Sequence, residues 1–207
     1  MINKELQKRI ISSVILLPLA LYFIFAGSLY LIFFTMICFF VSIYEWNKMV
    51  KKIELKFFGT LFLVCSFYTF YEISIDYFWV FVLLVCVSTD IGGYVFGKLF
   101  KGPKITKISP NKTYSGMIGG YVISLIFLSF FMNWIDYTVN MEWFIVTILI
   151  STVSQIGDIT ISYFKRLSNV KDTGKIIPGH GGLLDRIDGM IFAFPIFYLI
   201  NLTGYLS

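Results

Sequence analysis

Residues 77–97 read YFWVFVLLVCVSTDIGGYVFG, a run that contains a single charged side chain, Asp90. A membrane-spanning helix needs about 20 mainly apolar residues, whereas a buried strand has about 5–8. Comparable runs recur along the 207-residue chain, which is 57% hydrophobic and 14% charged, with a mean hydropathy of +0.81. A soluble domain would have about a quarter of its residues charged. The sequence therefore predicts an all-α, polytopic membrane protein.

The apolar runs predict about seven transmembrane helices, at 10–26, 28–44, 57–71, 77–97, 116–133, 143–163 and 189–206. The first run follows basic residues as in a signal peptide. The next run starts almost at once and no small-residue cleavage site is evident, so we expect an uncleaved span. We treat 1–207 as one integral-membrane domain, with N-terminal spans in 1–75 and catalytic spans and cytoplasmic loops in 77–207.

Positive charges are confined to alternate segments between these spans. The N-terminal tail and the connections after the second, fourth and sixth spans contain all 17 Lys and Arg residues. These residues stay on the cytoplasmic side because their translocation is unfavourable. We therefore expect a multi-pass protein of the inner (cytoplasmic) membrane, with its N-terminus and charged loops in the cytoplasm. The resulting basic face suits the lipid bilayer's anionic headgroups and phosphorylated ligands, and no nucleic-acid partner is expected.

Most of the polar chemistry lies in 162–188, which reads SYFKRLSNVKDTGKIIPGHGGLLDRID. Its glycines permit the backbone to wrap a ligand and offer N–H groups to phosphates, around the single histidine, His180. A purely structural role for this histidine stays open. Asp185 and Asp188 are three apart, so on a helix they would point the same way, and such oxygen donors suit Mg²⁺. No His and Cys set favours zinc.

Two intramembrane carboxylates extend this pattern. Asp158 is spaced so that a helix places it on one face with a hydroxyl and two cations, Ser162, Lys165 and Arg166. That stripe suits a metal–nucleotide site better than a lipid-facing surface. For Asp90 we weigh metal binding against a salt bridge to a lysine of a neighbouring helix. The small residues that follow it permit close helix contact or approach to a ligand: Gly92, Gly93 and Gly97.

The segment 109–116, SPNKTYSG, predicts the start of a helix, with Ser109 as the cap and Pro110 in the first turn. Free N–H groups there, with Lys112 and Thr113, are suited to hold a phosphate. A plain capped loop explains the same residues equally well.

Carboxylates for a divalent metal, cations for phosphates and a membrane-edge position together indicate phosphoryl or nucleotidyl transfer onto a lipid. No Walker A sequence is present, which disfavours a P-loop NTPase.

The segment 162–188 resembles the signature of the phosphatidate cytidylyltransferases, or CDP-diacylglycerol synthases, at every fixed position: S-x-FKR-x4-KD-x-G-x2-IP-x-HGGL-x-DRID. Segments 90–97 and 109–116 also resemble this family, although Tyr114-Ser115 stands where the family often has Trp-Glu. The resemblance implies transfer of the cytidylyl group of CTP to phosphatidate, giving CDP-diacylglycerol and pyrophosphate in phospholipid biosynthesis. It also implies Mg²⁺, with a second cation left open, and a homodimer.

The resemblance assigns roles to individual residues of this sequence. The expected metal-site carboxylates are Asp158, Asp185 and Asp188, to which we add Asp90. The residues expected to act on the reacting phosphates are Lys165, Arg166, His180 and Arg186. The residues expected to bind substrate are Ser109, Lys112, Thr113, Ser162, Lys171, Gly181 and Gly182.

Two other activities fit part of the pattern. Another CTP-using membrane enzyme, such as a polyprenol kinase or a CDP-archaeol-type synthase, would share the phosphate chemistry. A transporter would use Asp90 and Asp158 to bind cations, but it leaves 178–188 unexplained.

Overall fold

The computed structural model describes residues 14, 18–20, 22–23, 25–75, 78–106 and 108–206. The predicted first span, 10–26, lies mostly outside these residues. The same is true of several charged residues used to predict the orientation, namely Lys4, Lys8, Arg9 and Lys107.

The secondary-structure elements of the described residues are all helices and include no strand, which confirms the all-α prediction. Five helices in this part of the chain are long and apolar enough to cross a membrane. They are α2 (Ser28–Met49), α3 (Ile53–Ile73), α4 (Phe78–Phe100), α5 (Tyr114–Trp134) and α6 (Met141–Leu167). They correspond to the second to sixth predicted spans. Two shorter helices follow, α7 (Leu184–Ile187) and α8 (Met190–Leu202).

Two helices differ in length from the predicted spans. The third span, predicted at 57–71, is the 21-residue α3, which begins at Ile53 and takes in Lys56. The long stem of a lysine allows its ammonium group to stay at the membrane edge while the helix continues. In contrast, α8 has only 13 residues where 189–206 was expected to span the membrane. It ends at Leu202, so the count of about seven spans is not confirmed.

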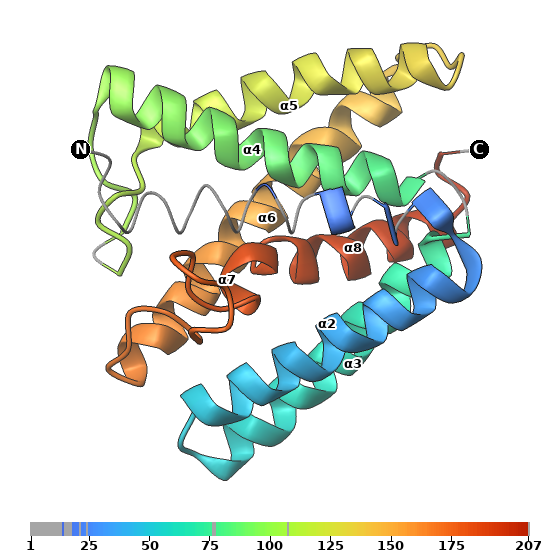
Figure 1. Ribbon diagram of the computed structural model, residues 1–207. Coiled ribbons are helices and arrows are strands. Elements are labelled where there is room, and N and C mark those ends of the chain that lie inside the picture. Colours follow the sequence, from blue (N-terminus) through green and yellow to red (C-terminus); the bar gives the residue numbers. More distant parts are fainter. Residues whose placement is uncertain are drawn as a thin grey trace. The chain divides into compact units, whose positions relative to one another are not determined.

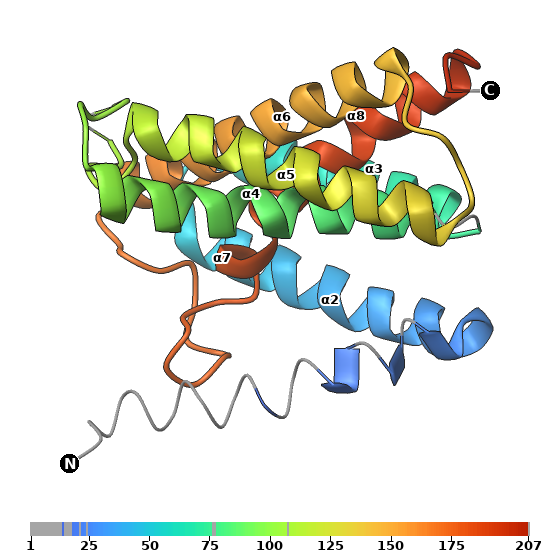
Figure 2. The same cartoon turned by 90° about the horizontal axis from the view of Figure 1, so that it is seen from above.

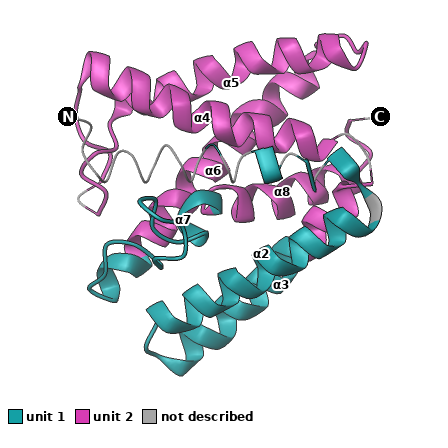
Figure 3. Ribbon diagram, viewed as in Figure 1, with its two compact units in different colours: residues 1–67, 164–187 teal, residues 68–163, 188–207 magenta. Residues whose placement is uncertain are grey.

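The chain divides into two compact units, residues 1–67 with 164–187 and residues 68–163 with 188–207 (Figure 3). The first unit contains α2, α7 and most of α3, and the second contains α4, α5, α8 and most of α6. The single integral-membrane domain over 1–207 stays a prediction.

In the first unit, α2 and α3 pack as a helical hairpin (Figure 1). Trp46 of α2 is buried, and its Nε1 donates a hydrogen bond to the Leu55 carbonyl at 3.1 Å. Gly59 leaves space for this indole, since a Cβ at position 59 would overlap the ring. Replacing a buried Trp by Ala costs about 3–5 kcal/mol. Trp46 therefore fixes the end of α2 that also carries Glu45.

In the second unit, α4 and α5 lie side by side along a seam of glycines (Figure 1 and Figure 2). A Cβ at Gly92 would overlap the Gly119 backbone, and a Cβ at Gly116 would lie 2.7 Å from the Gly93 carbonyl oxygen. Small residues allow this close approach of helices in lipid. Of the two roles predicted for Gly92, the structure confirms helix contact.

The core of the second unit is an aromatic cluster centred on Phe81 of α4. Its ring centroid lies 5.6 Å from that of Phe131 on α5, 5.1 Å from Trp143 on α6 and 5.6 Å from Phe197 on α8. All four side chains are buried. Each such aromatic pair contributes about 0.5–1.5 kcal/mol beyond its burial. One side chain of α4 thus joins three further helices.

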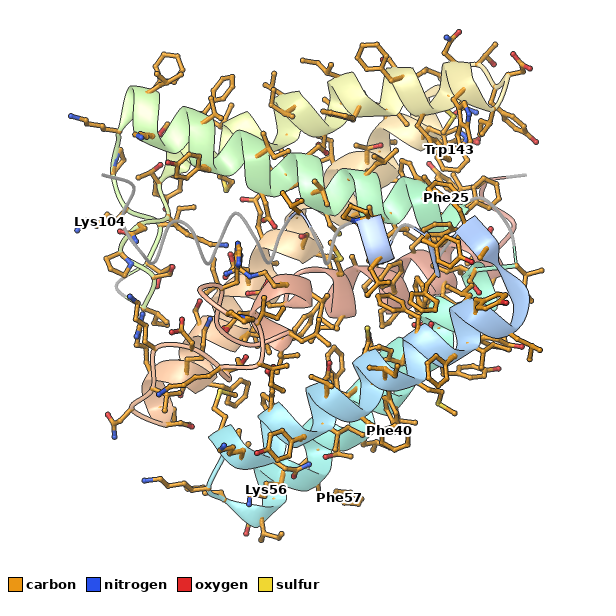
Figure 4. All side chains as sticks on the ribbon, viewed as in Figure 1. Phe25, Phe40, Lys56, Phe57, Lys104 and Trp143 are labelled. Atoms are coloured by element: carbon orange, nitrogen blue, oxygen red, sulfur yellow. The ribbon has the colours of Figure 1, made fainter. Side chains whose placement is uncertain are left out.

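The surfaces and ends of the helices are those of a multi-pass membrane protein. Phe40 of α2 and Phe57 of α3 are 62% and 66% exposed, and Phe57 points away from the hairpin (Figure 4). The last turns of α2, α4 and α6 contain Lys or Arg, whereas those of α3, α5 and α8 contain none. Cations are favoured at helix C-termini. The alternation is the one expected when successive spans cross in opposite directions.

Candidate active site

The glycine-rich segment of the first unit forms a tight hairpin. Ile177 N donates to the Gly181 carbonyl at 2.9 Å, and His180 N donates to the Ile177 carbonyl at 3.0 Å. Gly179 and Gly181 have φ values of 76° and 89°, a left-handed conformation that glycine adopts without a Cβ penalty. Arg186 Nη2 donates to the His180 carbonyl at 2.6 Å. The glycines therefore shape a preformed turn that α7 holds in place.

Asp185 is the centre of a hydrogen-bond network beside this hairpin. Its Oδ1 accepts from Lys165 Nζ at 2.7 Å, and its Oδ2 accepts from Thr173 N at 2.9 Å and Gly182 N at 3.0 Å. The side chains of Asp185 and Lys165 are 6% and 12% exposed. Burial alone would raise the pKa of Asp185, but the hydrogen bonds and the lysine charge outweigh it and hold the pKa below its usual value. Asp185 thus ties both ends of the loop 173–182 to α6.

A second carboxylate, Glu45 of α2, holds the same loop. It is fully buried, and its Oε1 accepts from Leu183 N at 3.1 Å. Its Oε2 accepts from Leu184 N at 2.9 Å and from Thr173 Oγ1 at 3.2 Å. Sequence reasoning misses Glu45, because it comes one residue after the predicted span 28–44 among the charges of a loop. The signal that would have found it is the cost of a carboxylate at the end of an apolar run.

The carboxylate of α6 lies in the second unit, where Lys112, from the loop before α5, forms an ion pair with Asp158. Their side chains are 23% and 26% exposed. Ser162 Oγ donates to Asp158 Oδ1 at 3.3 Å. Since α6 continues to Leu167, it carries all four residues of the predicted stripe: Asp158, Ser162, Lys165 and Arg166. The helical stripe is therefore confirmed.

Asp188 packs against the same part of α6. A Cβ at Gly157 would lie 2.9 Å from the Asp188 carbonyl oxygen, and a Cβ at Gly189 would lie 3.0 Å from the Ser154 carbonyl oxygen. Glycine on both sides allows the turn at 188–189 to contact the helix directly. Asp188 is 9% exposed and its Oδ1 accepts from Gly189 N at 2.9 Å. The turn that carries Asp188 thus lies against the residue next to Asp158.

The predicted helix cap at Ser109 is wrong. α5 begins at Tyr114 and its cap is Thr113, whose Oγ1 accepts from Gly116 N at 3.1 Å. An antiparallel bridge between Lys104 and Thr113 accompanies an extended backbone at residue 113. The helix can therefore start only after this bridge.

Asp185 and Asp188 do not lie on one helix, so the shared direction that their spacing would give on a helix does not apply. α7 ends at Ile187, and Asp188 lies in the turn before α8. The reason is local: the Asp188 carboxylate accepts the N–H of Gly189, and such side-chain bonds to the backbone compete with helix formation.

The other predicted site residues lie on loops and helix ends. Three cations of the first unit have exposed side chains, Arg166, Lys171 and Arg186, and His180 is partly exposed. Asp90 lies on an exposed position of α4. A direct role for these residues toward a ligand stays a prediction.

The carboxylates of the second unit suit Mg²⁺ by their chemistry. Mg²⁺ takes one or two carboxylates and completes its shell with phosphates and water, and Asp158 with Asp188 matches that number of carboxylates. Asp185 differs, because internal donors occupy both of its oxygens. Among the residues that the structure describes, no three His, Cys, Asp or Glu side chains gather as a metal site. A shared site for all the predicted metal ligands stays a prediction.

The sequence model of the cytidylyltransferase family matches residues 55–203. The chain belongs to the cytidylyltransferase family. This match takes in the predicted site residues from Asp90 to Asp188, whereas Glu45 precedes it.

Named members of the cytidylyltransferase family are similar to this chain. A phosphatidate cytidylyltransferase of Staphylococcus saprophyticus is 43% identical over 123 residues, covering 58% of this chain and 47% of that protein. One of Staphylococcus haemolyticus is 41% identical over 140 residues, covering 65% of this chain and 54% of that protein. One of Rickettsia bellii is 41% identical over 133 residues, covering 59% and 58%. The chain thus spans about half the length of the relatives it matches.

Proposed function

We propose that this protein is a phosphatidate cytidylyltransferase, which transfers the cytidylyl group of CTP to phosphatidate in phospholipid biosynthesis. The observation that carries the proposal is the complete signature in 162–188, within which Asp185 accepts hydrogen bonds from Lys165, Thr173 and Gly182. The family match and the names of the relatives support it. The bilayer would supply phosphatidate, and cations at the helix ends suit the phosphates of CTP.

In this reaction a phosphate oxygen of phosphatidate attacks the α-phosphorus of CTP. The new P–O bond gives CDP-diacylglycerol, and the bond from the α-phosphorus to the bridging oxygen breaks and releases pyrophosphate. Two unit charges 4 Å apart repel by about 1 kcal/mol in water and by about 4 kcal/mol at an effective dielectric constant near 20. Neutralising that repulsion is the main task of the protein.

The cations of the first unit perform part of this task. Arg166, Lys171 and Arg186 have exposed side chains that can approach phosphate oxygens. Lys165 is held by Asp185, so its charge is fixed in position before any substrate arrives. Preorganised charge of this kind stabilises the transition state without a reorganisation cost.

Asp158 and Asp188 of the second unit would hold Mg²⁺, with a second cation as an open alternative. The bound ion would neutralise charge on the triphosphate. Lys112 pairs with Asp158 in the structure. With Asp158 as a metal ligand, Lys112 would be available to contact a phosphate. Ser162, which bonds Asp158, keeps the carboxylate oriented.

The proposal also places the protein in the inner membrane as a homodimer, with the N-terminus and the loops containing 98–113 and 164–188 in the cytoplasm, where CTP is made. The alternation of basic helix ends supports this orientation. Chemical labelling of single cysteines in these loops, from either side of sealed vesicles, tests it.

The test uses the purified full chain in detergent with phosphatidate, Mg²⁺ and CTP labelled at the α-phosphate. We expect the label in a cytidine-bearing lipid, with one pyrophosphate released per transfer. In a parallel reaction with CTP labelled at the γ-phosphate, label in the lipid would show a lipid kinase. Preference for an ether-linked isoprenoid acceptor would show a CDP-archaeol-type synthase. Cation flux in liposomes without CTP use would show a transporter.

A further inference from the structure

We propose that Glu45 is a positioning residue for nucleotidyl transfer, and that it sets the conformation of the signature loop 173–184. Glu45 lies on α2, before the part of the chain that matches the family. The predicted effect of Glu45 on activity rests on the proposed function, whereas its predicted effect on the conformation of the loop does not.

Glu45 joins the two ends of the loop. It accepts from Thr173 Oγ1 at the start of the loop and from Leu183 N and Leu184 N at its end. Asp185 joins nearly the same ends through Thr173 N and Gly182 N. Two carboxylates from different helices therefore close one loop at its ends. The hairpin with His180 lies between these ends.

The loop is shaped to receive Glu45. A Cβ at Gly182 would lie 2.5 Å from Glu45 Oε2, and a Cβ at Gly174 would overlap Oε1. Glycine at both positions is therefore required by the carboxylate. Gly182, which was expected to bind substrate through its N–H, donates that N–H to Asp185 instead.

The position of Glu45 is itself rigid. The next residue, Trp46, bonds the Leu55 carbonyl of α3, and its ring packs edge-on against Phe164 of α6 at 5.1 Å between centroids. Packing of the neighbouring residue thus helps to hold the carboxylate in place. A residue held this firmly can transmit its geometry to the cations that follow the loop, such as Arg186.

The chemistry of the three partners requires a carboxylate. All three are donors, and both oxygens of an ionised carboxylate are acceptors. Gln at position 45 would keep the shape but replace one acceptor by an NH₂ group. In either orientation that group faces the N–H of Leu183 or of Leu184, so one buried donor loses its partner.

The experiment measures hydrogen exchange in peptides covering 173–187 of the full chain, and label transfer from CTP on the same preparations. The variants are Glu45→Gln, Thr173→Val and Thr173→Ser, with Glu54→Gln, an exposed glutamate on α3, as the control. We expect Glu45→Gln to speed exchange in this loop and to lower kcat by about 100-fold, the size of effect that a displacement near 1 Å produces. KM for CTP should change by less than about threefold, since uniform binding is not what is lost.

Thr173→Val removes one of the three bonds and should give an intermediate loss, and Thr173→Ser, which retains the hydroxyl, should restore wild-type values. The two Thr173 variants test the proposal if Glu45→Gln fails to insert into the membrane. Unchanged exchange in Glu45→Gln and Thr173→Val would overturn the proposal, and so would faster exchange with unchanged kcat. A wild-type chain without CTP turnover would contradict the proposed function alone, and the exchange data would still test whether Glu45 anchors the loop.

Discussion

Asp185 and Asp158 are both aspartates paired with a lysine, yet their surroundings are opposite. Asp185 is 6% exposed and accepts two backbone N–H bonds in addition to Lys165. Asp158 is 26% exposed, and besides its ion pair with Lys112 it accepts one hydrogen bond, from the Ser162 hydroxyl. Breaking a buried ion pair costs about 3–5 kcal/mol, whereas an exposed pair is worth about 0–1 kcal/mol. We therefore expect Asp185 to maintain the fold, whereas the proposed function requires Asp158 to exchange its partner for a ligand.

The largest effect is expected at Asp188, which lies with Asp158 in the second unit. Asp188→Asn should lower label transfer by about 100-fold or more, because it removes a charge that would hold the metal. The Asn side-chain oxygen can still accept from Gly189 N, so the turn and membrane insertion should persist. A variant that retains most of its activity would remove Asp188 from the proposed metal site.

Substitution of the two lysines sharpens the comparison. Lys165→Ala should destabilise the protein by about 3–5 kcal/mol, because it leaves Asp185 buried without its cation. Lys112→Ala should have the smaller effect, about 1 kcal/mol, because its pair is only partly buried and keeps contact with solvent. Thermal unfolding in detergent measures both, with Lys165→Arg as the charge-preserving control. Equal losses of stability in the two alanine variants would contradict the distinction between the two pairs. Unchanged kinetics of Lys165→Ala would show that its charge does not act on the reacting phosphates.

A smaller effect is expected from filling the space around the loop. Gly182→Ala places a Cβ against Glu45 and Thr173 and should cost about 1–3 kcal/mol as overpacking. Gly93→Ala is the matched control, because its nearest contact would be 3.8 Å away, and it should stay within about 0.5 kcal/mol. The melting temperatures of the two variants measure the two losses of stability. A larger loss at Gly93 would mean that the α4–α5 seam, not the loop, limits stability.

The smallest effect is a pH dependence of the stability that Asp185 contributes in the first unit. The pKa of Asp185 is lower in the folded protein than in the unfolded chain. Its contribution to stability is therefore present above the unfolded value of about 3.9 and is lost as the pH falls through the folded value. The difference in melting temperature between wild type and Asp185→Asn should be constant near neutral pH and should shrink below about pH 4. A difference that does not change with pH would contradict the charge-based account of this network.

The sequence was informative where local pattern decides the structure. Apolar runs located five of the helices, although Lys56 and Lys165 fall inside helices because a lysine at a helix end does not stop it. The helical spacing of Asp158 and Ser162 predicted their shared face, and a hydrogen bond joins them.

The remaining features depend on contacts between distant residues. Glu45 bonds Leu184, 139 positions later, and no periodicity encodes that pairing. Thr113 displaces Ser109 as the helix cap because residue 104 pairs with it. The break after Ile187 depends on a side chain that bonds its own neighbouring backbone, which competes with a helix in a way that spacing does not reveal.

The most direct measurement is made on Asp158→Asn and Asp185→Asn side by side, recording label transfer from CTP and the melting temperature of each preparation at neutral pH. We predict that Asp158→Asn loses transfer while its melting temperature stays near that of wild type, and that Asp185→Asn loses both. If Asp185→Asn kept its stability and lost only transfer, or if Asp158→Asn remained active, the two carboxylates would not have the separate roles argued from their surroundings.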